Sequence, residues 1–179
     1  MSTVTLIWIV VAIALVAVLA AVGYIVQRRR NLRERFGPEY ARTVNERDSR
    51  VEAEQELRAR EKRFAAFDIK PLAPDARQSY AERWNKLQER FVDSPAAAVS
   101  EADQLVQSAM AERGYPTESF DQQVSDLSVV HGRTMDHYRR AHDISDRAST
   151  DQASTEELRQ AMVHYRALFE ELLDSRYGR

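Results

Sequence analysis

Four histidines are the side chains best suited to acid–base or metal chemistry, because only histidine titrates near neutral pH without help from its surroundings. They are His131, His137, His142 and His164. A zinc site on one helix needs ligands four residues apart, whereas His137 and His142 are five apart. His131 and His142 share a helical face but would lie about 16 Å apart along the axis. The spacing therefore favours structural histidines, at the edge of the core or at helix ends.

A second arrangement is open if the last helix brings His164 towards the other histidines. The region would then combine His131, His142 and His164 with Tyr138 and Tyr165 and could serve a small-ligand- or metal-dependent enzyme. This alternative hypothesis requires that His142 and His164 meet around a cavity in the folded chain.

The patterns of other common catalytic sites are missing from the sequence. The five glycines are isolated, and neither a phosphate-binding loop nor a GxSxG motif occurs. The chain has no cysteine, which excludes disulfides, a thiolate nucleophile, a cysteine zinc site and palmitoylation. We therefore expect a protein that is not an enzyme, with no catalytic residue, no cofactor and no metal.

One turn could present an aromatic side chain to a partner. Arg113 and Gly114 are followed by Tyr115 and Pro116, and Phe120 comes shortly after. Because a Tyr-Pro corner beside a glycine can expose its ring, Tyr115, Pro116 and Phe120 form the candidate partner surface. The alternative is that this turn is buried.

The N-terminal segment predicts a membrane anchor. From Val4 to Val26 the chain is almost wholly apolar and uncharged, and this length of helix spans roughly 34 Å, enough for a hydrocarbon core of about 30 Å. A cleavable signal peptide would need a basic start and a shorter apolar run. We therefore expect an uncleaved transmembrane helix over residues 1–27, with Trp8 and Tyr24 at its interfaces.

A basic juxtamembrane segment over residues 28–38 follows the anchor. Its cations are Arg28, Arg29, Arg30, Arg33 and Arg35. Basic residues stay on the cytoplasmic side, so they predict a single-pass protein of the inner membrane, with its N-terminus outside and its C-terminal domain in the cytoplasm. The same arginines are candidates for contact with anionic lipid headgroups, although a simple stop-transfer cluster explains them too.

The rest of the chain is acidic. After Arg35 the sequence carries 21 basic and 27 acidic residues, a net charge of −6. Affinity for nucleic acid comes mainly from clustered Lys and Arg. We therefore expect no nucleic-acid partner.

Few glycines and no alternating apolar strands predict an all-α domain. Gly37 and Pro38 mark a joint, after which residues 39–70 read as one charged, largely exposed stalk helix. Pairs such as Glu54–Arg58 and Glu56–Arg60 would stabilise it. Its apolar stripe is too sparse for a strong coiled coil.

Residues 71–174 predict a compact antiparallel bundle of about five helices, and residues 175–179 a flexible tail. Helix starts are expected near Asp75, Pro95, Ser119, Arg133 and Ser154, and Gly114 should end the second of these helices. Ser154 and Glu157 can form a capping box. The final helix has an apolar stripe with a period of 3.6 residues: Leu158, Ala161, Met162, Tyr165, Leu168, Phe169 and Leu172.

Four strings in the chain resemble a family of short bacterial proteins with one N-terminal membrane segment. They are FGPEY (36–40), FVDSPAAAV (91–99), RGYP (113–116) and HYRALFEELL (164–173). The resemblance covers nearly the whole chain and implies the same plan of anchor and helical domain. It brings no assigned activity and no functional residue.

These observations together predict a single-pass membrane protein with a cytoplasmic helical domain. We expect a non-enzymatic interaction or scaffold module that binds an unidentified protein or a second copy of itself.

Overall fold

The computed structural model describes residues 3–174, with side chains described for residues 7–9 and 11–174. This part of the chain contains helices and no strand, which confirms the all-α prediction. The predicted tail at residues 175–179 lies outside it. The helices are α1 (Thr3–Phe36), α2 (Pro38–Glu46), α3 (Arg50–Phe64), α4 (Pro74–Arg90), α5 (Pro95–Arg113), α6 (Phe120–His131), α7 (Met135–Ser149) and α8 (Thr155–Leu173).

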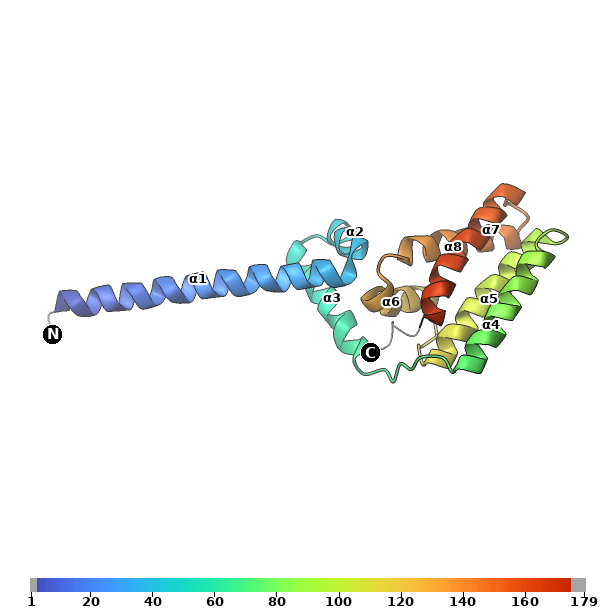
Figure 1. Cartoon of the computed structure of the whole chain (residues 1–179). Helices are drawn as coiled ribbons and strands as arrows, with labels where there is room; N and C mark the ends of the chain where they lie inside the picture. Colours follow the sequence, from blue (N-terminus) through green and yellow to red (C-terminus); the bar gives the residue numbers. More distant parts are fainter. Residues whose placement is uncertain (1–2, 175–179) are drawn as a thin grey trace.

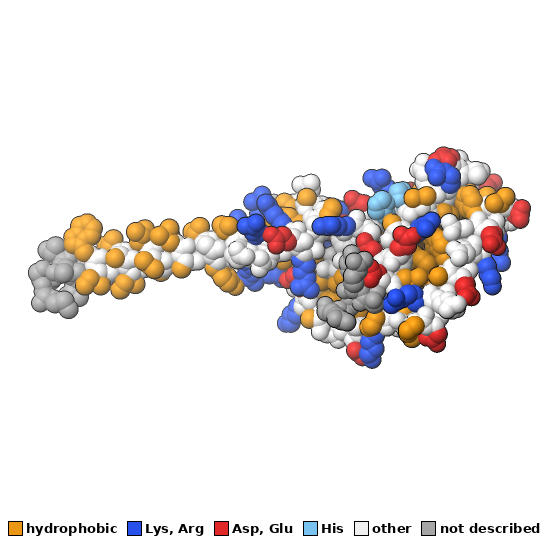
Figure 2. Space-filling view, viewed as in Figure 1, with side chains coloured by type: hydrophobic (Ala, Val, Ile, Leu, Met, Phe, Trp, Pro, Cys, Tyr) orange, Lys and Arg blue, Asp and Glu red, His pale blue; other side chains and the backbone are white. Residues whose placement is uncertain are grey.

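Helix α1 projects from the rest of the molecule (Figure 1). Figure 2 shows apolar side chains along its outer part and charged side chains where it enters the domain. Of the helices described, α1 is the one long and apolar enough to cross a membrane. It continues through the expected juxtamembrane segment, and its last turns bury Leu32 and Phe36 in the domain.

The joint predicted at Gly37 and Pro38 is confirmed. Gly37 has a φ of 54°, in the left-handed region that favours glycine, and Pro38 is the first residue of α2. The chain therefore turns sharply between α1 and α2.

The stalk prediction is corrected, because residues 39–70 do not form one extended helix. Helix α2 ends at Glu46 and α3 begins at Arg50, where Ser49 caps it by accepting a hydrogen bond from the Glu52 N–H at 3.2 Å. The two helices fold against each other and against the end of α1, and α3 also packs on α6 (Figure 1). Tyr40 and Leu57 of this segment are buried in those contacts, whereas Val51 remains 59% exposed.

Helices α4 to α8 form the predicted bundle of five helices, with α8 packed on α5 and α7 (Figure 1). Gly114 ends α5 with a φ of 95°, and both hydrogen bonds of the Ser154–Glu157 capping box are present. Ser94 is at the N-cap of α5 as expected, but its side chain makes no capping hydrogen bond. All seven positions of the predicted α8 stripe are buried.

Two apolar clusters form the core. The larger lies within the bundle, where Trp84 stacks on Phe169 with ring centroids 4.7 Å apart. The smaller joins α1 to the domain and contains Leu32, Phe36, Tyr40, Leu57 and Val129. The end of α1 is therefore a structural part of the domain.

Candidate functional site

Two carboxylates are buried where α2 and α3 meet the bundle. Glu39, in the first turn of α2, is 1% exposed, and Glu54, on α3, is 4% exposed. A buried carboxylate without a partner is strongly unfavourable, so each needs cations around it. We call this region, with the α3–α6 contacts beside it, the ion-pair junction.

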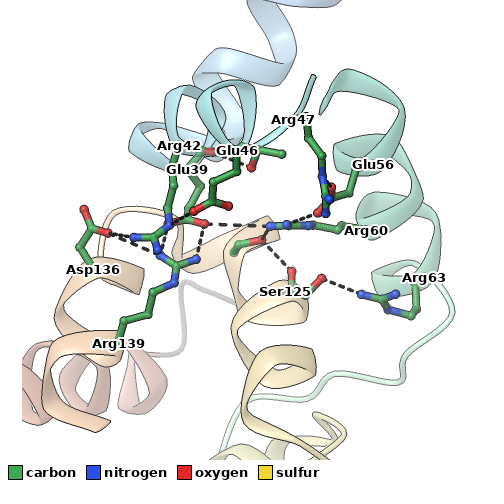
Figure 3. Close-up of polar contacts among 12 residues, drawn as sticks. Glu39, Arg42, Glu46, Arg47, Glu56, Arg60, Arg63, Ser125, Asp136 and Arg139 are labelled. Carbon is green, nitrogen blue, oxygen red and sulfur yellow. Dashed lines mark hydrogen bonds and ion pairs between the residues drawn. The ribbon is translucent and has the colours of Figure 1, made fainter. Parts of the chain in front are cut away.

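Glu39 is held by an arginine 100 residues away in the sequence. Both Nη atoms of Arg139, on α7, donate to its two oxygens, with Nη2–Oε2 at 2.7 Å (Figure 3). The Nη1 atom of Arg60 lies 4.0 Å from Glu39 Oε2. Burial works against the charged guanidinium, but the hydrogen bonds to Glu39 raise the pKa of Arg139 above its usual value. This forked pair fixes α2 to α7.

A second group of charges joins α3 to α6. Glu56 lies between Arg47 and Arg60 and accepts hydrogen bonds from both (Figure 3). Burial opposes ionisation of Glu56, yet these arginines lower its pKa overall. Arg63 donates to the buried Asp126 at 2.7 Å and to Ser125 Oγ at 2.8 Å.

Glu54 joins α3 to α1 and α2 through hydrogen bonds and ion pairs. Its Oε1 accepts a hydrogen bond from the Tyr40 hydroxyl at 2.9 Å and lies 3.2 Å from Arg29 Nε, and Arg58 Nη2 donates to Oε2 at 3.3 Å. The predicted Glu54–Arg58 and Glu56–Arg60 pairs are thus present, but Glu54 is buried rather than exposed.

The five juxtamembrane arginines have different surroundings. Arg29 and Arg35 pair with Glu54 and Glu61 of α3, the latter at 3.3 Å. Arg28 and Arg30 interact within α1, with the Tyr24 ring and with Glu34 respectively. Arg33 lies over the Tyr40 ring of α2. Part of the basic cluster therefore holds the domain against α1.

Trp8 and Tyr24 are 69% and 65% exposed on the apolar part of α1. This exposure leaves both rings free for the interfacial positions that the sequence predicts.

His131 and His164 lie in separate places. His131 is buried, with Nδ1 2.7 Å from Glu171 Oε2 and Nε2 3.3 Å from the Tyr115 hydroxyl. His164 faces His137, with 2.8 Å between the two Nδ1 atoms, so one of them carries the shared proton. Burial, followed by the nearby His137 and Arg140, lowers the pKa of His164.

His142 has a third environment. Its ring stacks on Phe120 with centroids 3.7 Å apart, and its Nδ1 is 3.8 Å from Asp103 Oδ1. The interaction with Asp103 raises the pKa of His142 against the effect of burial. The Tyr138 ring is 6.5 Å from His142 and 6.2 Å from Tyr165, so both predicted tyrosines lie nearby.

The enzyme alternative required His142 and His164 to meet around a cavity, and the structure places them against different partners. Within the described part of the chain, no three His, Cys, Asp or Glu side chains are grouped as metal ligands would be. The histidine region therefore has the geometry of three separate polar contacts in a packed bundle.

The turn with the candidate partner residues Tyr115, Pro116 and Phe120 is packed against the rest of the domain. Tyr115 is 4% exposed, and burial raises the pKa of its hydroxyl to about 12. Pro116 and Phe120 are half-buried, and the Phe120 ring lies 5.1 Å from Tyr138. The turn packs tightly because a Cβ on Gly114 would come within 2.7 Å of the Asp68 carbonyl oxygen. The Tyr115 ring is therefore part of the core, and the Phe120 ring is only partly exposed.

A groove between α4 and α8 is a better candidate for a partner. It has a volume of about 180 Å³ and is lined by Trp84, Phe91, Met162 and Val163, with arginines at its edge. Val163 is 54% exposed, although it lies on the helix with the most regular apolar stripe. Sequence reasoning missed this groove because it is formed by two helices that are distant in the chain.

Sequence reasoning also missed the buried charges. Arg113 is 1% exposed and donates to the Leu172 carbonyl at 2.9 Å and the Lys70 carbonyl at 3.2 Å. Asp126, Glu39 and Glu54 are buried as well. Charged residues are rarely buried unless paired, and no local signal in the sequence identifies a partner many residues away.

We compared the chain with protein-family models, curated proteins and solved structures, and no match was found in any of the three. The functional argument therefore rests on the geometry described above.

Proposed function

We propose that this protein is a non-enzymatic interaction module held at a fixed orientation on the cytoplasmic face of the inner membrane. The observation that carries the proposal is that α1 continues without a break from its apolar part into the domain core, where Phe36 is fully buried. An anchor on a flexible linker would only restrict the domain to the surface. Here the anchor is built into the fold and sets the direction in which the domain faces.

The ion-pair junction supports this proposal. Glu39–Arg139 joins α2 to the bundle, and Arg29–Glu54 joins α3 to α1. Both carboxylates are buried, so breaking either pair leaves an uncompensated charge. We infer that the bundle and the anchor move as one unit.

The orientation is part of the proposal and follows from the arginines on one side of the apolar run. An enzyme that is active only outside the cytoplasm, fused after Arg179, should stay inactive. The same enzyme fused before Met1 is the matched control and should be active if the N-terminus is outside. Activity of the C-terminal fusion would contradict the cytoplasmic assignment.

We propose that the α4–α8 groove binds a heterologous protein with an apolar segment flanked by acidic residues. Val163 is the exposed apolar side chain of the groove, and Arg159 and Arg166 are the cations among its lining residues. Arg159 and Arg166 also pair with Glu156 and Glu170 of α8. These pairs are exposed, so acidic residues of a partner could compete with the two glutamates for the arginines. Charge complementarity of this kind mainly directs partner choice.

A photo-crosslinking amino acid at position 163, used in the intact membrane, tests this. The control position is 92, since Val92 is also an exposed valine, at 82%, but lies outside the groove. We expect a saturable crosslink to one protein from position 163 alone, which weakens when both Arg159 and Arg166 are changed to Glu. Equal crosslinks from both positions would contradict the groove as the docking surface, and crosslinks only to a second copy would replace the heterologous partner with self-association.

A further inference from the structure

Helix α3 crosses the end of α1 obliquely (Figure 1), and the ion pairs between them keep a nearly constant register. Arg29 pairs with Glu54, and Arg35 pairs with Glu61. Leu32 and Leu57 are buried in the same small cluster between these two pairs. Each ion pair joins residues 25 or 26 positions apart, so the contacts follow the same order along both helices.

Extending this register back by one turn places the start of α3 beside the end of the apolar span. The turn before Glu54 contains Arg50 and Val51, and the turn before Arg29 contains Ile25 and Val26. Figure 1 shows the start of α3 on the side of the domain that faces the span. The first turn of α3 therefore lies at the depth where the membrane surface begins, if α1 spans the membrane as proposed above.

The side chains at this level suit a lipid surface. Val51 is 59% exposed although α3 is a highly charged helix, and Arg50 beside it is exposed as well. The exposed Arg28 and Arg30 of α1 follow Val26, the last apolar residue of the span, within about one turn. Asp48 and Glu52 balance the charges of Arg47 and Arg50 within the turn, so the net positive charge comes from α1.

We propose that the first turn of α3 is a second membrane contact, in which Val51 enters the headgroup layer of the bilayer and Arg50 binds lipid phosphate. An exposed apolar side chain beside an arginine is a feature of helices that lie at a membrane interface. Arg28 and Arg30 attract anionic lipids to the same place. Because α3 is tied to α1 through Glu54, this contact prevents the domain from tilting on its anchor. The proposal rests on the membrane span of the proposed function.

Depth measurements in nanodiscs test this on the full-length protein. The chain has no cysteine, so single cysteines can be introduced without removing native ones. Val51→Cys carries a nitroxide label at the proposed contact, and Lys62→Cys is the control near the other end of the same helix, about 16 Å further along its axis. Val16→Cys, at an exposed position in the middle of the apolar run, tests the span itself.

We expect the label at 51 to collide severalfold more with a nickel-chelating lipid than the label at 62, which should collide mainly with a water-soluble nickel complex. The label at 16 should collide with oxygen and with neither nickel reagent. Equal behaviour of labels 51 and 62 would overturn the α3 contact while leaving the span intact. A water-accessible label at 16 would instead overturn the span on which the inference rests.

A second experiment tests whether Val51 itself, rather than an attached nitroxide label, enters the headgroup layer. With the nitroxide at Gln55, an exposed position one turn further along α3, Val51→Asp should reduce collisions with the nickel lipid. Val92→Asp is the matched control and should leave them unchanged. No effect of Val51→Asp would contradict an apolar role for this side chain.

Discussion

At the scale of single residues, the Glu39–Arg139 pair shows that this fold depends on buried ion pairs that the sequence alone does not reveal. Glu39 has almost no exposed surface, and the two guanidinium nitrogens of Arg139 occupy both of its oxygens. Removing the arginine leaves a carboxylate that water cannot reach.

Arg139→Met should therefore lower the free energy of unfolding by about 3 kcal/mol, measured by denaturant titration of the full-length protein in detergent. Arg140→Met is the control on the same helix. Arg140 is exposed, so its replacement should change stability by less than about 0.5 kcal/mol. Equal effects would show that Glu39 is not dependent on Arg139.

His142 should make the protein less stable as the pH rises. Its pKa is raised, chiefly by Asp103 of α5, with further contributions from Asp146 of α7 and Asp121 of α6. A raised pKa in the folded state means that the stabilisation is complete below the unfolded value of about 6.5 and is lost as pH rises through the folded value. The stabilisation from this group should therefore decrease as the pH rises above about 6.5.

The measurement compares the free energy of unfolding of the wild type and His142→Asn across a pH series that begins below about 6.5 and extends into the alkaline range. His164 has a lowered pKa and contributes the opposite slope, but it is present in both proteins and cancels in the comparison. The wild type should lose its advantage over His142→Asn as pH rises. A difference that stays constant with pH would contradict the role assigned to Asp103.

At the scale of helices, the start of α8 depends on its capping box. The Ser154 hydroxyl accepts a hydrogen bond from the Glu157 N–H at 3.3 Å, and the Ser154 N–H donates to Glu157 Oε2 at 2.8 Å. Ser154→Ala should cost about 1 kcal/mol of unfolding free energy. Ser94→Ala is the matched control, because Ser94 is also an N-cap but makes no side-chain hydrogen bond, and it should have a much smaller effect in the same denaturant titration.

The contact between α1 and α6 depends on the small size of Gly132. A Cβ there would come within 2.3 Å of the Phe36 carbonyl oxygen, which is backbone and cannot rotate away. Gly132→Ala should destabilise the protein by about 1–3 kcal/mol, as overpacking does in other cores. Gly23→Ala, where nothing lies within 4 Å, should have no such cost in the same unfolding measurement. Similar stabilities of the two variants would contradict the close packing of α1 on α6.

At the scale of the whole molecule, the boundary between anchor and domain does not lie at the end of the apolar run. Leu32 and Phe36 fill the core around Leu57, and Arg29 and Arg35 pair with acids of α3. A soluble form that keeps these residues should fold like the intact protein, and one that lacks them should not.

Two truncated chains test this boundary. A chain that begins at residue 37 loses Leu32 and Phe36 and should be less stable than one that begins at residue 27 by at least about 3 kcal/mol, the scale of removing one large buried side chain. Chemical unfolding followed by circular dichroism measures the difference. Equal stability would mean that α1 merely tethers the domain, and the proposed fixed orientation would fail with it.

The sequence by itself determined the features that depend on neighbouring residues. The long apolar run of α1, the joint at Gly37, the end of α5 at Gly114 and the capped, striped helix α8 all follow from local chemistry. Helix periodicity, capping and backbone preference act over a few residues, so a single sequence displays them directly.

Only the tertiary structure decided what those helices contact. The segment predicted as a free stalk became two packed helices, because Leu57 and Glu54 found partners on α1 and α6 that its own sequence does not contain. Glu39 and Arg139 are 100 residues apart, and Tyr115 is buried by chain segments on both sides of it. Burial and ion pairing depend on surfaces that folding brings together. A glutamate on an isolated helix is solvated, whereas the same glutamate buried between packed helices needs a cation to stabilise its charge.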